Sequence, residues 1–265
     1  MPTGAVGCWA TSLVRRRSLG GVTTTAQRDD QDRFDHLLEV VGSVLDPALD
    51  VLDAMTRVVD ACVHWTAATE AGIVLADQSG ALHVIASTSE RSIEAEEAQL
   101  GTNEGSCLDC FRTGATVDVP DVTAKAAEWP TFTQVMRERG LVGTFAEPVR
   151  LRTATIGSLC VFADHDRGHD DGDVVVIQLL ADAASAALVR HRAEGMQRSL
   201  DAQIADALEA RVLLEQAKGA LAYRRDVQID EAFRVLRDGA GRTGRGLRDV
   251  AEDVVQRGAD LREFA

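Results

Sequence analysis

The sequence predicts an α+β domain with an antiparallel sheet of about five strands, followed by a long linker helix and an all-α unit of three helices. Three observations predict this fold class. Short β-rich runs alternate with helical stretches between residues 34 and 190. A proline-free helical segment then extends from Asp173 to about Tyr223. Two amphipathic stretches follow it, and their spacing is helical.

The first half opens with a helical pattern from Phe34 to Val63 that we expect to break at Asp46-Pro47. Two β-rich runs, Ile73–Ala76 and Leu82–Ser87, flank Asp77-Gln78-Ser79-Gly80, which predicts a hairpin. A helix is expected around 92–100, a short strand over 116–122, and a helix over 131–140 that ends at Gly140. Two more strands, 144–151 and 155–164, complete a sheet whose crossing helices would close a small-molecule pocket on one face.

The second half is helical throughout. We expect Asp173 to cap a helix whose apolar residues recur at steps of three and four, which suits a two-stranded coiled coil as well as a core face. Two shorter helices follow, the first capped by Asp230 and the second ending before Gly258. This unit is too small to bury much apolar surface alone, so it depends on the long helix or on a dimer partner.

Composition limits the class of protein. The chain has 265 residues, of which 45% are apolar, and no apolar run approaches the roughly 18 residues that cross a bilayer. Residues 1–32 are interpreted as a flexible leader, or as the result of a misassigned start codon, because Arg15–Arg17 follow the weakly apolar part as they would not in a signal peptide. Five cysteines without an export signal argue against a disulfide framework, and we expect a cytoplasmic protein.

The net charge of −14 argues against nucleic-acid binding along the whole chain, but the charge is uneven. Between Lys218 and Arg248 there are eight basic residues and four acidic ones. A basic surface confined to this end is compatible with a polyanionic partner.

Residues 208–255 resemble the ANTAR domain, an RNA-binding three-helix module of bacterial transcription antitermination regulators. The run Glu-Gln-Ala-Lys-Gly at 215–219, Glu-Ala-Phe at 231–233, Leu236-Arg237 and 247–251 follow the family's order and spacing. The sequence departs from the family at Asp226, where glycine is common, and in the glycine-rich stretch 241–246. The resemblance implies binding to paired hairpin loops of nascent RNA, with dimerisation as the activating step.

The candidate RNA-binding residues are those whose side chains could contact phosphates or stack on bases. Basic side chains supply salt-dependent phosphate contacts, and unstacked bases pack on aromatic or guanidinium planes. The candidate RNA-binding residues are Lys218, Gly219, Tyr223, Arg224, Arg225, Arg237, Arg245 and Arg248. Without the motif, each arginine alone would be interpreted as part of a solvated helix face.

Residues 34–190 resemble a GAF domain, a small-molecule sensor fold. The resemblance rests on EGSCLDCFRTG at 104–114, VDVPDV at 117–122, WPTF at 129–132 and the two strands at 144–163. It implies a ligand pocket between the sheet and the crossing helices, near 102–110 and 117–122, with an unknown occupant and cofactor. The expected domains are a leader at 1–32, a GAF-like domain at 33–190, a linker helix or coiled coil at 191–206 and an ANTAR domain at 207–260.

The pair Cys107 and Cys110 allows three interpretations: a metal site, a redox switch or a packed helix. A Cys₄ zinc site needs a second pair, whereas Cys62 and Cys160 are isolated in apolar runs, so no metal site is predicted. Ser106 would cap a helix that turns Cys107, Cys110 and Phe111 toward the sheet. A thiolate at such a helix N-terminus has a lowered pKa, which makes Cys107 a candidate oxidant sensor. The pocket and redox candidates are Thr102, Cys107, Cys110 and Phe111.

Two other classes of function remain open. The first is an enzyme, such as a GAF-fold reductase of free methionine sulfoxide that uses Cys107, Cys110 and Cys160. The second is a ligand-sensing protein whose C-terminal helices bind a protein partner. We expect no catalytic residue, because no P-loop, GxSxG or zinc-hydrolase motif occurs. His165 and His169, among five aspartates, are interpreted as part of a solvated loop, with a cation site as the alternative.

Overall fold

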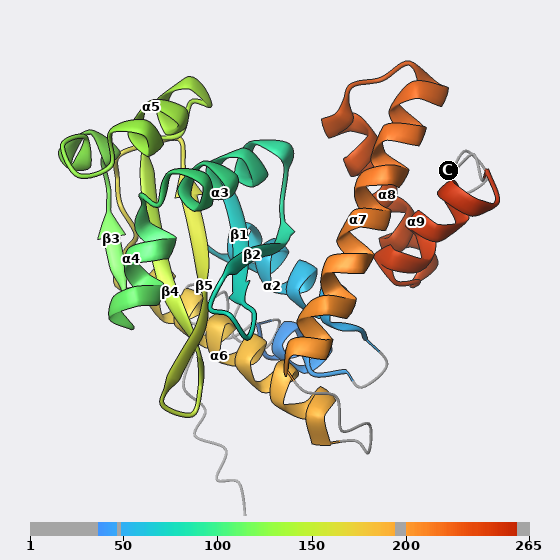
Figure 1. Cartoon of the computed structure of the whole chain (residues 1–265), viewed down its shortest axis with the longest axis horizontal. Coiled ribbons are helices and arrows are strands. Elements are labelled where there is room, and N and C mark those ends of the chain that lie inside the picture. Colours follow the sequence, from blue (N-terminus) through green and yellow to red (C-terminus); the bar gives the residue numbers. More distant parts are fainter. Residues whose placement is uncertain (1–36, 47–48, 194–199, 259–265) are drawn as a thin grey trace, which may run out of the picture. The chain divides into compact units, whose positions relative to one another are not determined.

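The computed structural model describes residues 37–46, 49–193 and 200–258 (Figure 1). They form an α+β part, residues 37–193, and a helical part, residues 200–258, and all belong to one compact unit that begins at Leu37. The expected leader lies outside the described residues.

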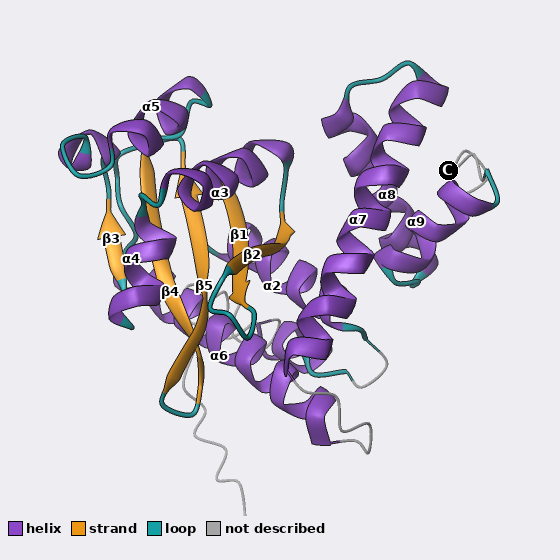
Figure 2. Cartoon of the chain, in the orientation of Figure 1, coloured by secondary structure: helices purple, strands orange, loops and turns teal. Residues whose placement is uncertain are grey.

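The sheet has five strands in the order β2-β1-β5-β4-β3, and every neighbouring pair is antiparallel (Figure 2). The strands are β1 (Glu70–Ala76), β2 (Leu82–Ser87), β3 (Val117–Val119), β4 (Gly143–Leu151) and β5 (Ala154–Ala163). The predicted hairpin joins β1 to β2. Asp77 Oδ1 accepts hydrogen bonds from the amides of Ser79 and Ala81, and Gly80 has a φ of 81° that glycine adopts readily.

Helices cover both faces of the sheet (Figure 1). Helices α2 (Val51–Trp65) and α6 (Asp171–Ala193) pack on one face. The other face carries α3 (Glu90–Thr102), α4 (Ser106–Thr113) and α5 (Pro130–Glu138), with the short 3₁₀ helix η1 (Val122–Lys125). A further helix spans residues 37–44, and residues 46, 49 and 50 before α2 are not helical, whereas Pro47 of the expected break lies outside the described residues.

Alternating side chains of the strands build the two cores. Leu159 and Val161 of β5 pack with α2 and α6, whereas Cys160 and Phe162 point to the face that carries α3, α4 and α5. The predicted α+β architecture, with crossing helices on one face and terminal helices on the other, is confirmed.

The helical part contains α7 (Leu200–Arg225), α8 (Ile229–Thr243) and α9 (Leu247–Gln256). It has its own core of Leu214, Ala217, Leu221, Ala232, Phe233, Leu236, Leu247, Val250, Ala251 and Val254. Between α7 and α8, Asp226 has a φ of 52°, the left-handed conformation that favours glycine at this turn. The predicted continuity of the long helix depends on residues 194–199, which lie outside the described residues.

Three predicted helix caps are wrong. Helix α6 begins at Asp171, and Asp170 Oδ1 accepts the amide of Asp173, so Asp173 lies in the first turn. Helix α8 begins at Ile229, which places Asp230 inside it. The residue before α4 is Gly105, and Ser106 instead pairs its hydroxyl with that of Thr144 at 2.7 Å. The errors are of one to three residues, because a sequence pattern does not define the end of a helix more closely than this.

Helix α6 also corrects the expectation about apolar runs. Asp171–Val189 is long and apolar enough, by length and composition, to cross a membrane. Its buried side chains, among them Ile177, Leu180 and Ala184, form the core with α2 and the sheet. A core helix of this kind meets the same criterion as a membrane span.

Candidate nucleic-acid interface and sensor interior

The candidate RNA-binding residues fall into an exposed group and a covered group. Tyr223 is 90% exposed near the end of α7, and Arg224 and Gly219 are exposed on the same helix. A Cβ atom at Gly219 would meet nothing within 4 Å, so packing does not require glycine there. Tyr223 is therefore available for stacking on a base.

Lys218 belongs to the covered group, because its side chain is only 1% exposed. Its Nζ pairs with Glu215 of α7 at 2.7 Å and with Glu90 at the start of α3. It also lies 5.0 Å from the centre of the Phe233 ring. A buried ammonium group is stable only with such partners, so Lys218 is fully engaged within the protein.

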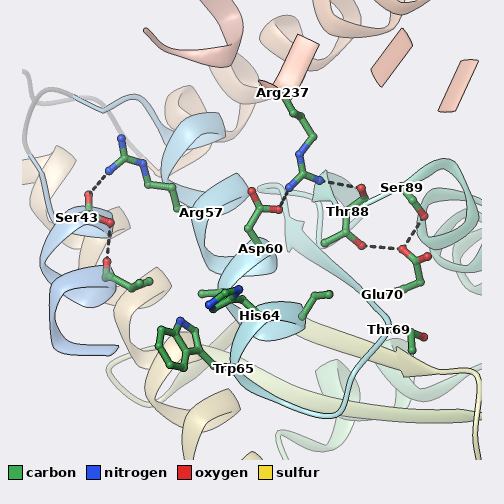
Figure 3. Close-up of a pocket in the computed structure, with 13 residues that line it drawn as sticks. Ser43, Arg57, Asp60, His64, Trp65, Thr69, Glu70, Thr88, Ser89 and Arg237 are labelled. Carbon is green, nitrogen blue, oxygen red and sulfur yellow. Dashed lines mark hydrogen bonds and ion pairs between the residues drawn. The ribbon is translucent and has the colours of Figure 1, made fainter. Parts of the chain in front are cut away.

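Arg237 of α8 is only partly covered, with 22% of its side chain exposed, and it also pairs with a carboxylate (Figure 3). Its guanidinium pairs with Asp60 of α2 and donates a 2.7 Å hydrogen bond to the carbonyl oxygen of Thr88. Burial raises the pKa of Asp60, and the charge of Arg237 opposes that rise. The structure thus brings two of the predicted RNA-binding residues against carboxylates of the α+β part.

Other candidate arginines bind within the helical part. Arg245 pairs with Asp253 at 2.6 Å, and this hydrogen bond lowers the pKa of Asp253. Arg224 donates to the carbonyl oxygen of Val254 at 2.9 Å. Arg225 and Arg248 are half-buried. These side chains partly hold the three helices together, so their substitution affects more than a surface charge.

Further contacts join the two parts. The Leu247 amide at the start of α9 donates to Asp53 Oδ1 at 2.6 Å, and burial raises the pKa of Asp53 to about 6. Arg211 of α7 donates to the carbonyl oxygen of Val84 at 2.5 Å and pairs with Glu97 at 3.1 Å. Sequence reasoning missed these acidic partners, because nothing local links α2 or α3 to residues more than a hundred positions away.

A cavity of about 810 Å³ lies beside the Arg237–Asp60 pair (Figure 3). Arg57, His64 and Trp65 line it together with Glu70 at the start of β1 and Thr88 just after β2. The pocket predicted near 102–110 and 117–122 would lie on the opposite face of the sheet, and none of those residues lines this cavity.

The two cysteines of the Cys-x-x-Cys pair are buried on α4 with no exposed surface, whereas Thr102 and Phe111 are half-buried. Burial raises the pKa of Cys107 to about 11 and that of Cys110 to about 12. The expectation that the helix N-terminus lowers the pKa of Cys107 is wrong, because loss of hydration outweighs the helix dipole. A packed helix describes this segment best.

The loop histidines also differ from expectation, because both are partly buried and neither is fully solvated. His165 Nε2 lies 3.0 Å from the carbonyl oxygen of Ala67, and His169 lies 5.3 Å from the Phe145 ring, centre to centre. Burial lowers the pKa of His169, which favours its neutral form.

Two family models match the chain. The GAF domain matches residues 48–189 and the ANTAR domain matches residues 202–255. No curated protein matches the chain.

Solved structures of low sequence identity resemble the α+β part. GAF domains of phosphoenolpyruvate-protein phosphotransferases from Acinetobacter and Coxiella burnetii are 15% and 16% identical, each with a TM-score of 0.49. Each comparison covers 62% of this chain; it covers 96% of the Acinetobacter domain and 97% of the Coxiella burnetii domain. A free methionine-R-sulfoxide reductase from Neisseria meningitidis is 16% identical, with a TM-score of 0.48, over 61% of this chain and 90% of the other.

Proposed function

Because this chain belongs to the GAF-domain family and carries an ANTAR domain after its GAF domain, we propose that it is a signal-responsive RNA-binding regulator of transcription antitermination. In this proposal the GAF domain senses a small molecule or a redox state. The ANTAR domain binds hairpin loops of nascent RNA, and the working form is a cytoplasmic homodimer. We retain domain boundaries of 33–190 for the sensor, 191–206 for the linker and 207–260 for the ANTAR domain.

The observation that carries the proposal is the pairing of Lys218 and Arg237 with Glu90 and Asp60. Carboxylates of the sensor occupy the positions that RNA phosphates would take on these two cations. RNA and sensor therefore compete for the same charges, and a signal that weakens the sensor contacts would increase RNA binding. The two ion pairs support a regulator in which the GAF domain controls the ANTAR domain, because they join the two domains.

A reductase of free methionine sulfoxide is not favoured. Such chemistry requires a reactive thiolate. Cys107, Cys110 and Cys160 have no exposed surface, and burial raises the pKa of all three. A protein-binding role for the C-terminal helices is the outcome to which a failure of RNA binding would point.

The proposal is tested by fluorescence anisotropy of a two-hairpin RNA with the full-length protein at low salt. Tyr223→Ala should weaken binding about 5- to 150-fold, because base–aromatic stacking contributes about 1–3 kcal/mol. Val212→Ala, another exposed apolar side chain on α7, is the matched control and should leave binding unchanged. Equal affinities for wild type, Tyr223→Ala and Val212→Ala would argue against a base contact at Tyr223. No binding even at low salt would remove the RNA proposal.

A further inference from the structure

Three side chains of metal-ligand type meet inside the sensor domain. They are Glu96 of α3, Cys107 of α4 and Cys160 of β5, and all three are fully buried. A carboxylate oxygen and the two Sγ atoms all lie within 4.8 Å of one another. Three different elements supply these groups, so the tertiary fold creates the cluster and the Cys-x-x-Cys spacing does not.

The buried Glu96 carboxylate has the two thiols as neighbours. Its Oε2 accepts a 3.0 Å hydrogen bond from Gln99 Nε2, whereas Oε1 has no nitrogen or oxygen donor among the described residues. The thiols of Cys107 and Cys160 hydrogen-bond to the carboxylate and so oppose the rise that burial causes in its pKa. A bound cation would replace these thiol protons as the partner of the carboxylate.

The surrounding polar groups hold the cluster in place. Gln99 bridges two members, since its Nε2 binds Glu96 and its Oε1 accepts the Cys107 amide at 2.9 Å. Ser158 donates to the Cys107 carbonyl oxygen at 3.0 Å. Hydrogen bonds from neighbouring residues typically orient the side chains that ligate a metal, and a side chain that only packs in a core does not need them.

Gly72 leaves room beside Glu96 Oε1. It pairs with Cys160 across strands β1 and β5. A Cβ atom at this position would stand 2.9 Å from Glu96 Oε1, closer than side chains tolerate. Glycine on β1 thus permits the carboxylate to reach the two sulfur atoms.

We propose that Glu96, Cys107 and Cys160 bind a thiophilic divalent cation of the zinc class inside the sensor domain. Two thiolates and a carboxylate suit zinc, and two sulfurs on one tetrahedral zinc lie about 3.8 Å apart. The three ligand atoms lie within 4.8 Å of one another, a limit that includes this spacing. As the cation binds, each thiol releases its proton to solvent and each sulfur forms one metal bond. Three protein ligands leave a fourth position for water or another small ligand.

The experiment titrates Co²⁺ into full-length protein that has been freed of metal and kept reduced, in a Cys8→Ser background. That background removes the thiol that lies outside the described residues. We expect a near-ultraviolet sulfur-to-cobalt absorption band that saturates at one Co²⁺ per chain and disappears when Zn²⁺ is added. The site does not depend on RNA binding, so its test is separate from the test of the proposed function.

Single substitutions assign the ligands. Cys160→Ser and Glu96→Gln should each weaken Co²⁺ binding at least tenfold, and Glu96→Gln preserves shape. Cys62→Ser is the matched control, because Cys62 is equally buried but packs in the other core with α2 and α6. Circular dichroism verifies that each variant is folded.

Three outcomes would overturn the proposal. The first is wild-type protein without the sulfur-to-cobalt band. The second is a band that Cys160→Ser leaves unchanged while Cys110→Ser abolishes it, which would place the metal on the Cys-x-x-Cys pair instead. The third is an affinity that Glu96→Gln does not lower, which would show that the carboxylate is not a ligand.

Discussion

Competition between the sensor and RNA predicts that neutral substitutions at Asp60 and Glu90 will strengthen RNA binding. Asp60→Asn removes the charge opposite Arg237, and Glu90→Gln removes one of the two charges opposite Lys218. Both substitutions keep the size of the side chain. They act on residues of the α+β part, so the RNA-binding candidates themselves stay intact.

The magnitude follows from what remains after substitution. Lys218 keeps Glu215, and Arg237 keeps the carbonyl oxygen of Thr88. The Arg237–Asp60 pair is partly solvated, with 22% and 39% of the two side chains exposed, so its loss is worth about 1 kcal/mol. Lys218 is buried, but it keeps its pair with Glu215, so we assign about 1 kcal/mol to the loss of Glu90 as well. Two pairs give about 2 kcal/mol, which changes the docking equilibrium about 30-fold. If the form in which Lys218 and Arg237 pair with Glu90 and Asp60 dominates without RNA, the apparent Kd for RNA falls by up to that factor.

The assay is anisotropy of a two-hairpin RNA at several salt concentrations with wild type and the Asp60→Asn/Glu90→Gln variant. The control variant is Glu94→Gln/Glu128→Gln, which changes net charge equally but removes pairs with Arg139 and Lys125 inside the α+β part. We expect tighter binding for the first variant and a far smaller change for the control. Equal gains in both would show that only net charge matters, and no gain in either would refute the competition.

Four further predictions follow from single sites. In the Asp60→Asn/Glu90→Gln background, Arg237→Ala should weaken RNA binding and reduce the dependence of log affinity on log salt by about one unit; an unchanged salt dependence would exclude a phosphate contact. The pKa of Asp53 is raised from 3.8 to about 6, so the folded state favours the protonated carboxyl. The free energy of unfolding is therefore highest below pH 4 and falls by roughly 2–3 kcal/mol as the pH rises to 6. Asp53→Asn should therefore raise the Tm at pH 7.5 and leave it nearly unchanged at pH 4. An equal rise in Tm at both pH values would contradict a raised pKa for Asp53. Gly157→Ala should destabilise the protein by about 2 kcal/mol or more in urea unfolding, because its Cβ would meet the carbonyl oxygen of Val74, whereas Gly101→Ala meets nothing and should be neutral or slightly stabilising. With Cys8→Ser, the metal-free native protein should react slowly with a thiol reagent, because its remaining four cysteines are buried; rapid reaction of Cys107 would restore the oxidant-sensor hypothesis.

The sequence predicted the fold class because its signals are local. Asp77–Gly80 carries turn chemistry between two β-rich runs, and the apolar spacing in 247–255 is complete enough to define one face of α9. Helix starts were less accurate, since Ser106 and Asp173 are good caps that lie one to three residues inside the observed helices.

Contacts between distant residues could not be predicted from local patterns. Arg237 and Asp60 are 177 positions apart, and nothing in either helix specifies the other. The environment of Cys107 depends on Glu96 of the preceding helix and Cys160 of β5. A prediction from its helix N-terminus alone therefore gave the wrong direction for its pKa.

The central claim, RNA binding by the C-terminal helices under control of the sensor, is tested most directly by sequencing RNA crosslinked to the protein in cells. Three forms are compared: wild type, Asp60→Asn/Glu90→Gln, and the same variant with Tyr223→Ala and Arg237→Ala added. The account predicts enrichment of transcripts with paired hairpins, a higher yield for Asp60→Asn/Glu90→Gln, and loss when Tyr223 and Arg237 are replaced. Equal recovery of RNA with all three forms, or no enrichment with any of them, would contradict it.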